Sequence, residues 1–204
     1  MPDALRRALT VARRVLTTAI ALLALAGPAI APLQAASDPA APQLLEGPAY
    51  EKRLHALLDE ATVSVDAMIY LVHLPPEAKR GQPVRRILDH LAATRRRGVA
   101  VRVIFDAGAP GGEGEDGEPV RPNLPAATAL RAAGVDVRWD EDTRTTHAKA
   151  VVIDGRHCLI GSGNWTAAAL RNNRELNVEL DSPAVAAQFA TVFEKAWKAG
   201  RPAP

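Results

Sequence analysis

Cysteine is almost absent from this chain of 204 residues, which contains only Cys158. A disulfide within the chain is therefore excluded. Cys158 lies in an apolar stretch, where a buried free thiol with a structural role is the ordinary expectation. A zinc site needs three or four clustered ligands, and His147, Asp154 and His157 have no recognisable ligand spacing. We therefore expect no metal ion and no other cofactor.

An excess of one charge is also lacking once the amino terminus is set aside. Residues 1–36 carry four of the 25 basic residues and one of the 23 acidic residues, so the remaining chain has a net charge of −1. A general nucleic-acid binder is expected to have a basic face, and here only residues 85–86 and 95–97 offer local basic patches. Aromatic residues make up 4% of the chain. No basic amphipathic helix or aromatic cluster outside the amino terminus suits a membrane interface.

The longest apolar run lies near the amino terminus. Four arginines precede the apolar residues 15–26, and small residues follow around Ala35 and Ala36. This order predicts a secretory signal peptide over residues 1–36 and an exported protein, either periplasmic or secreted. Pro28 and Pro32 disfavour a full membrane span of about 20 residues. An uncleaved amino-terminal membrane anchor is the alternative.

The rest of the chain alternates between helix and strand patterns. Residues 37–47 are rich in Pro and Ala and predict a linker, and residues 48–200 predict one domain. Apolar residues at helical spacing predict helices that open at Pro48, Pro83, Pro125 and Pro183. Apolar runs between them predict strands, so we expect an α/β fold, a layered α/β/α sandwich with a central mixed, mainly parallel sheet. Residues 107–119, dense in Gly, Pro and acidic residues, predict a loop whose role the sequence leaves open.

Residues 147–165, HAKAVVIDGRHCLIGSGNW, carry polar residues at the spacing H-x-K-x4-D-x6-G-S-x-N. His147 and Lys149 are two apart in a predicted strand, so their side chains point to the same face. Asp154 and Gly155 predict a hairpin turn. The returning strand would then bring Ser162 and Asn164 to the end where His147 and Lys149 lie. An imidazole, a cation, a hydroxyl and an amide together suit a phosphate group.

These residues resemble the HKD motif of the phospholipase D superfamily at every fixed position. The resemblance implies a phospholipase D-like catalytic domain over residues 48–200, in which His147 forms a phosphohistidine without a metal ion. It implies that Lys149, Ser162 and Asn164 bind the substrate phosphate and that Asp154 is an orienting, structural residue of the motif. In the superfamily, a carboxylate downstream of the Asn commonly hydrogen-bonds the nucleophilic histidine. Glu175 stands at that place, and an exposed acid at a strand end is the alternative.

A second motif is missing, because no other histidine is followed by a lysine two residues later. The chain therefore resembles the single-motif branch of the superfamily, which includes small bacterial endonucleases and in which two subunits pair across a two-fold axis. An isologous pair would place one His147 from each copy opposite the other. We expect a homodimer with the active site at the two-fold interface.

The sequence favours an exported, metal-independent phosphodiesterase, specifically an endonuclease that cleaves DNA or RNA. The alternative is a phospholipase D-type hydrolase of phospholipid headgroups. A third reading is an inactive phosphodiester-binding domain, and the intact motif argues against it. The choice among DNA, RNA and lipid, the preferred strandedness and the cleavage of the leader are left open by the sequence.

Overall fold

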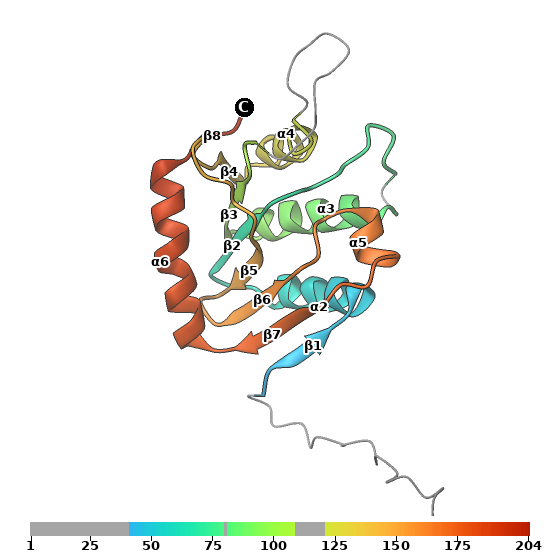
Figure 1. Cartoon of the computed structure of the whole chain (residues 1–204), viewed down its shortest axis with the longest axis vertical. Coiled ribbons are helices and arrows are strands. Elements are labelled where there is room, and N and C mark those ends of the chain that lie inside the picture. The colour runs from blue at the N-terminus through green and yellow to red at the C-terminus, as the bar shows by residue number, and fades with distance from the viewer. Residues whose placement is uncertain (1–40, 80, 109–120) are drawn as a thin grey trace, which may run out of the picture. The chain divides into compact units, whose positions relative to one another are not determined.

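The fold is taken from a computed structural model, which describes residues 41–79, 81–108 and 121–204. The predicted signal peptide and most of the acidic loop predicted over residues 107–119 lie outside the described residues. Helix and strand labels follow Figure 1.

The described residues form one eight-stranded sheet with the order β1-β7-β6-β5-β2-β3-β4-β8. The strands are β1 (Gln43–Leu45), β2 (Ser64–Ile69), β3 (Ala100–Phe105), β4 (Asp136–Trp139), β5 (Lys149–Ile153), β6 (His157–Gly161), β7 (Asn177–Asp181) and β8 (Arg201–Pro202). Strand β1 lies in the segment that the sequence predicted to be a linker, and it pairs with β7.

The prediction of a mixed sheet is confirmed, but the prediction that it is mainly parallel is wrong. Only β2–β3 and β3–β4 pair in parallel, and all the other pairs are antiparallel. Parallel neighbours need a long crossover, which here contains α3 or α4, whereas a short connection turns the chain back on itself. The turn at Asp154 and Gly155 joins β5 to β6 in this second way.

Helices cover both faces of the sheet, as the predicted layered α/β/α arrangement requires. They are α2 (Gly47–Glu60), α3 (Pro83–Arg96), α4 (Leu124–Ala132), α5 (Ala167–Arg171) and α6 (Pro183–Ala199). Helices α2 to α5 lie together on one face, and α6 lies alone on the other (Figure 1). The predicted openings at Pro83 and Pro183 coincide with the observed first residues. The side chains of Gln82 and Ser182 accept hydrogen bonds from the backbone of these first turns.

The alternation of side chains along the strands divides the core into unequal parts. Val65, Ala67 and Ile69 of β2 point into the larger core beneath α2, α3 and α4. Met68 points to the opposite face and packs with Ile104 and with Phe193 of α6. Side chains of one strand therefore reach both helical layers, so the strand ends are held from both sides.

Two further observations bear on the sequence predictions. Cys158 is buried and free, as expected. Within residues 41–79, 81–108 and 121–204, no helix has the length and apolar character needed to cross a membrane.

Candidate active site

The polar motif residues meet at one end of the sheet, where β5 lies between β2 and β6. Lys149, the first residue of β5, is paired with Ile69, the last residue of β2. Ala150 is paired with Ile160, so the residues after β6 begin at the same end. The backbone N–H of Tyr70 donates to the carbonyl of Ala148 at 2.8 Å and extends the contact beyond the strands.

His147 and Lys149 form the centre of this cluster. Lys149 Nζ lies 3.1 Å from His147 Nδ1 and 3.3 Å from His147 Nε2, and it donates to the His147 carbonyl oxygen at 3.0 Å. His147 is exposed, whereas Lys149 is only 7% exposed. Burial lowers the pKa of Lys149 from its ordinary value, and the charge of Glu175 acts in the opposite direction. The site therefore combines an accessible imidazole with a cation that the fold has already partly desolvated.

Tyr70 belongs to the cluster, although the sequence did not single it out. Its ring centroid lies 4.3 Å from that of His147, with the rings inclined at 51°. Lys149 Nζ lies 4.9 Å from the same ring centroid, within the range of a cation–π interaction. Tyr70 therefore restricts both the imidazole and the ammonium. The only signal in the sequence was that Tyr70 ends the alternating pattern of residues 63–70, which predicts a strand.

Ser162 and Glu175 interact directly with each other. The Ser162 hydroxyl donates to Glu175 Oε2 at 2.5 Å, and Asn173 Nδ2 donates to Glu175 Oε1 at 3.0 Å. These hydrogen bonds lower the pKa of Glu175, and the charge of Lys149 contributes in the same direction. Among the described residues, Glu175 has hydrogen bonds to these two side chains and none to His147. The resemblance implied a carboxylate that is hydrogen-bonded to His147. In the structure, Glu175 is hydrogen-bonded to Ser162 and Asn173 instead.

Asn164 has an unused polar atom. Its side-chain oxygen is buried and has no hydrogen-bond partner among the described residues. The backbone of the next residue, Trp165, donates to the Leu71 carbonyl at 3.0 Å, which holds Asn164 beside the end of β2. A half-turn of the amide presents N–H donors at the same position, and such donors suit a phosphate oxygen.

This arrangement of histidine, lysine, serine and asparagine agrees with a comparison of sequences. Residues 54–197 match the family described as "Cardiolipin synthase, PLD-like domain", over more than half of the chain. The chain belongs to the phospholipase D superfamily.

Curated relatives and solved structures extend the similarity to this superfamily. The chain is 34% identical over 111 residues to the mitochondrial cardiolipin hydrolase of Chlamydomonas reinhardtii, which covers 54% of this chain and 45% of that protein. It is 30% identical over 154 residues to the human protein of the same name, covering 76% of this chain and 53% of that protein. This chain thus spans about half the length of these relatives.

The fold resembles that of Nuc from Salmonella typhimurium, described as a phospholipase D family member. The TM-score is 0.65 with 24% identity, over 79% of this chain and 97% of that chain. NucT from Helicobacter pylori gives a TM-score of 0.59 with 17% identity, over 79% of this chain and 98% of that chain. The predictions of the superfamily and of its α/β fold are confirmed.

The motif aspartate of the superfamily lies away from the other motif residues. Asp154 follows the last residue of β5, at the opposite end of the strand from Lys149. Its carboxylate accepts backbone hydrogen bonds from Thr62 at 2.9 Å, Val63 at 2.8 Å and Ser64 at 2.9 Å. Burial alone would raise the pKa of Asp154, but these hydrogen bonds lower it below its ordinary value. Asp154 therefore joins the β5–β6 turn to the start of β2 and does not touch the reacting groups.

Two buried carboxylates fix the backbone just before His147. Asp106 Oδ2 and Asp140 Oδ2 both accept from the Thr146 backbone N–H, at 2.7 and 2.9 Å. Burial and the charge of Asp140 raise the pKa of Asp106. The sequence reasoning missed this pair as site residues. The one signal was that the two aspartates directly follow the strand patterns over residues 99–105 and 135–139. The ends of strands are where ligand crevices lie in open α/β sheets.

Asn123 is a second positioning residue that sequence reasoning missed. Its side chain accepts from the Val72 N–H at 2.7 Å and donates to the carbonyls of Tyr70 and Asp106 at 2.8 and 3.0 Å. One buried amide therefore ties together the chain segments that follow β2 and β3. No residue pattern near Asn123 indicates this role.

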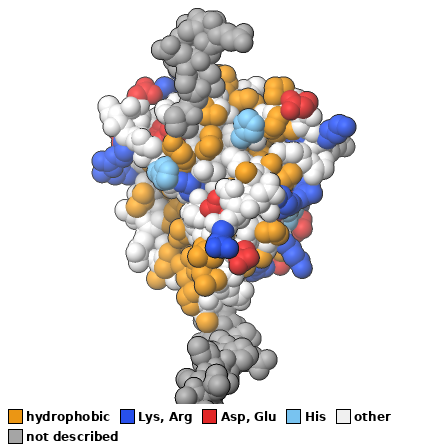
Figure 2. Space-filling model, turned by 45° about the vertical axis from the view of Figure 1, so that its right-hand side comes forward, with side chains coloured by type: hydrophobic (Ala, Val, Ile, Leu, Met, Phe, Trp, Pro, Cys, Tyr) orange, Lys and Arg blue, Asp and Glu red, His pale blue; other side chains and the backbone are white. Residues whose placement is uncertain are grey.

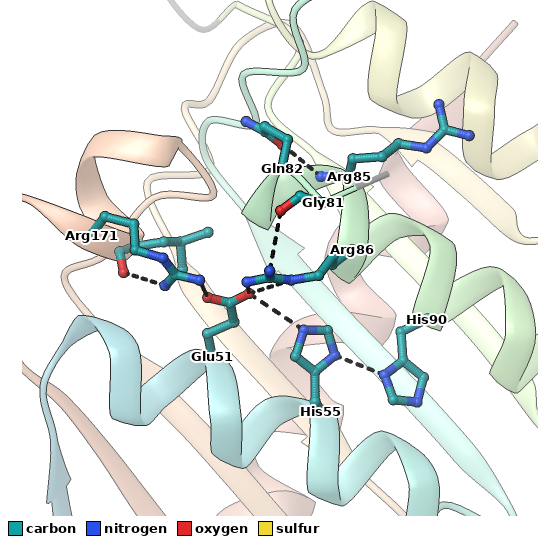
Figure 3. Close-up of polar contacts among 9 residues, drawn as sticks. Glu51, His55, Gly81, Gln82, Arg85, Arg86, His90 and Arg171 are labelled. Carbon is teal, nitrogen blue, oxygen red and sulfur yellow. Dashed lines mark hydrogen bonds and ion pairs between the residues drawn. The ribbon is translucent and has the colours of Figure 1, made fainter. Parts of the chain in front are cut away.

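A cluster of ion pairs around Glu51 holds the segment after Asn164. Figure 3 shows Glu51 of α2 between Arg86 of α3 and Arg171 of α5, with His55 beside it and His90 next in line. Glu51 is 3% exposed and forms ion pairs with both arginines. Burial alone would raise the pKa of Glu51, but the hydrogen bonds and charges of the arginines lower it. Glu51 thereby fixes the end of α5, from which the chain runs to Glu175.

One face of the molecule carries charges of both signs. On the face shown in Figure 2, basic and acidic side chains are interspersed with hydrophobic ones, and no single basic stripe crosses it. In the parts of the chain that the structure describes, no three or more His, Cys, Asp or Glu side chains are grouped in a way that suits a metal ion.

Proposed function

We propose that this chain is a metal-independent phosphodiesterase that acts through a phosphohistidine on His147. The proposal is carried by one observation, the accessible imidazole of His147 within 3.3 Å of a buried ammonium. A neutral imidazole is a nucleophile near neutral pH. Lys149 and the turned amide of Asn164 would stabilise the charge on the phosphate oxygens in the transition state. Ser162 would join them when its hydroxyl hydrogen, which Glu175 accepts in this structure, turns to the phosphate.

The proposed reaction has two balanced steps. In the first, a ring nitrogen of His147 forms a bond to phosphorus, and the bond from phosphorus to the leaving oxygen breaks. The leaving oxygen takes a proton from a second acid. In the second step, a water oxygen displaces the imidazole from phosphorus and gives its proton back to that acid.

We propose that the second acid is His147 of another copy of the chain. The single motif supports this arrangement, because one histidine cannot attack and protonate on opposite sides of the same phosphorus. A two-fold axis through the site would supply both groups. Sedimentation analysis under assay conditions tests this point: a strictly monomeric protein with full activity would contradict it.

The proposed chemistry is compatible with two classes of substrate, nucleic acids and phospholipids. The sequence favoured an endonuclease, and the fold similarity to Nuc and NucT fits that class. The second candidate is phospholipid hydrolysis. It is supported by the relatives named cardiolipin hydrolases. The net charge of −1 over residues 37–204 weakens the case for nucleic acid without by itself favouring lipid.

The deciding experiment is a side-by-side assay of the full-length protein in EDTA. The substrates are single-stranded DNA, double-stranded DNA, RNA and phosphatidylcholine vesicles, with the His147→Ala protein as control. Cleavage of any of them that survives chelation and is lost in the variant supports the proposed chemistry. Loss of all activity on chelation would refute metal independence.

We also propose that the protein is exported, on the basis of the predicted signal peptide over residues 1–36. Cell fractionation of the native protein followed by amino-terminal sequencing tests this. A mature protein that begins near residue 37 outside the cytoplasm is the expected result. An intact amino terminus in the membrane fraction would instead support the predicted anchor.

A further inference from the structure

Two buried carboxyl groups lie side by side where the parallel strands β3 and β4 end. Phe105 and Trp139, the last residues of these strands, are paired in register, so Asp106 and Asp140 follow at the same level. Neighbouring strands are about 4.8 Å apart. Asp106 is 2% exposed and Asp140 is 3% exposed. The two carboxyl groups are therefore close together and largely shielded from water.

One backbone N–H lies between these carboxyl groups. The Thr146 nitrogen lies 2.7 Å from Asp106 Oδ2 and 2.9 Å from Asp140 Oδ2. A hydrogen bond places the hydrogen about 2 Å from the oxygen, so the two oxygens are no more than about 4 Å apart. The other oxygens, Asp106 Oδ1 and Asp140 Oδ1, accept from the backbone of Gly108 at 3.0 Å and of Ala107 at 2.8 Å. The fold thus holds both carboxyl groups in fixed positions.

The surroundings do not neutralise two negative charges at this place. The charged side chains that line the pockets next to the pair come from the loop after β4, from the start of the motif and from α6: Glu141, Asp142, Arg144, His147 and Lys195. The cations Arg144 and Lys195 are exposed, and Arg144 lies 3.7 Å from Glu141. In the part of the chain that the structure describes, neither Asp106 nor Asp140 forms an ion pair with a cation. Two buried anions without a partner are strongly unfavourable.

Two carboxyl groups this close in a buried site do not both ionise, so one of them keeps a proton. Burial, the charge of Asp140 and a hydrogen bond between the two side chains raise the pKa of Asp106, which makes Asp106 the protonated member. We propose that Asp106 and Asp140 share one proton and that this proton holds His147 in position for reaction. The inference rests on the proposed function and adds two positioning residues to its site.

The pair acts on His147 through the backbone. Thr146 directly precedes His147, and its N–H is the group that both carboxyl groups hold. On the other side of His147, the Ala148 carbonyl accepts from the Tyr70 N–H at 2.8 Å. When the shared proton is lost at raised pH, the two anions repel each other and release Thr146. His147 is exposed, so it then moves away from the phosphate and activity falls.

The first measurement follows the proton and needs no activity. Carbon-13 NMR of the full-length protein, labelled at the aspartate carboxyl carbons, gives the pKa of each carboxyl group. Asp106 is expected to titrate above the ordinary value of about 4. Asp140→Asn removes the neighbouring charge and should lower the pKa of Asp106. Asp136→Asn is the matched control, because Asp136 is exposed at the opposite end of β4, and it should leave this pKa unchanged.

The second measurement compares pH profiles of kcat/KM on a soluble diester. In Asp106→Asn, the amide donates to Asp140 as the protonated carboxyl group does, and it stays neutral at every pH. The amide also loses one acceptor, and this loss does not change with pH. The ratio of kcat/KM of the variant to that of the wild type should therefore rise with pH, by up to about tenfold for each pH unit above the pKa of Asp106. The titrations of His147 and Lys149 occur in both proteins and cancel in the ratio.

Two results would overturn the inference. If Asp106 and Asp140 both titrated at about 4 in the wild type, the pair would share no proton. If the ratio of kcat/KM stayed constant with pH, the proton would not control His147. Should Asp106→Asn fail to fold, Asp140→Asn replaces it in the ratio, because it also removes the shared proton. The wild-type titration needs no variant and decides the first point in any case.

The two proposals can fail separately. A protein that hydrolyses no diester would contradict the proposed function, whereas the NMR titration would still show whether the pair shares a proton. A protein that hydrolyses diesters through His147 with a constant ratio would keep the proposed function and lose the positioning role of Asp106 and Asp140.

Discussion

Substitution of Asp154 tests the structural role of the motif separately from its chemical role. Its carboxylate accepts three backbone hydrogen bonds and one from the Thr62 hydroxyl at 3.0 Å. Its backbone has a φ of 52°, a left-handed conformation that Asn tolerates and Ala does not. We expect Asp154→Ala to destabilise the fold without altering the chemistry, because Asp154 lies five positions along the chain from Lys149, which corresponds to about 17 Å.

The expected loss follows from these contacts. Each hydrogen bond contributes about 0.5–1.5 kcal/mol net. Thr62 and Val63 are exposed, so water replaces part of the hydrogen bonding that the substitution removes. The left-handed backbone adds about 1 kcal/mol for Ala. We expect about 3 kcal/mol for Asp154→Ala, which is roughly 6–12 °C in Tm for a domain of this size. Asp154→Asn keeps one acceptor and the backbone conformation and should lose about 1 kcal/mol.

The assay combines urea unfolding followed by circular dichroism with kcat/KM of the folded protein. The low pKa of Asp154 means that its charge stabilises the fold above about pH 4, and that this contribution is lost as the pH falls through the folded-state pKa. The difference between wild type and Asp154→Asn should therefore shrink in acid. A folded Asp154→Ala protein with unchanged stability and a hundredfold lower kcat/KM would refute the reasoning.

Three further predictions concern the site and its supports. Lys149→Gln should lower kcat by about 10²–10³ because it removes the buried cation, measured with a soluble diester. Glu51→Ala should lower the free energy of unfolding by about 2–3 kcal/mol, because both arginines lose their partner but are partly exposed. Gly161→Ala should destabilise by about 1–3 kcal/mol, since a Cβ would lie 2.0 Å from the Asn177 side-chain oxygen; thermal unfolding measures this.

Matched controls make these outcomes decisive. Asp89→Ala breaks an exposed ion pair with Arg85 and should lower the free energy of unfolding by under about 0.5 kcal/mol. If Asp89→Ala destabilised the fold as much as Glu51→Ala, burial would not be the reason for the larger effect at Glu51. A Cβ at Gly81 would meet nothing within 4 Å, so Gly81→Ala should be neutral. Gly161→Ala with wild-type stability would show that β6 and β7 can separate freely. A Lys149→Gln protein with wild-type kcat would remove the lysine from the proposed mechanism.

Local sequence patterns were sufficient for most of the helices and strands and for the motif, but not for β1 in the predicted linker. Prolines and capping side chains mark the starts of α3 and α6, and alternating apolar residues mark β2. These signals depend on a few neighbouring residues, so they can be recognised in the sequence without knowledge of the rest of the fold. The spacing between His147 and Asn164 is also a local signal, because a single hairpin fixes it.

The tertiary structure alone decided which residues surround that hairpin. Tyr70, Asn123 and Asp106 reach the site from β2, from the start of α4 and from the end of β3. Their separations along the chain depend on strand order and register, which arise from packing across the whole sheet. The same cause explains why the mainly parallel sheet was a wrong prediction. It also explains why the carboxylate of Asp154 meets the backbone of Ser64, 90 residues away in the sequence.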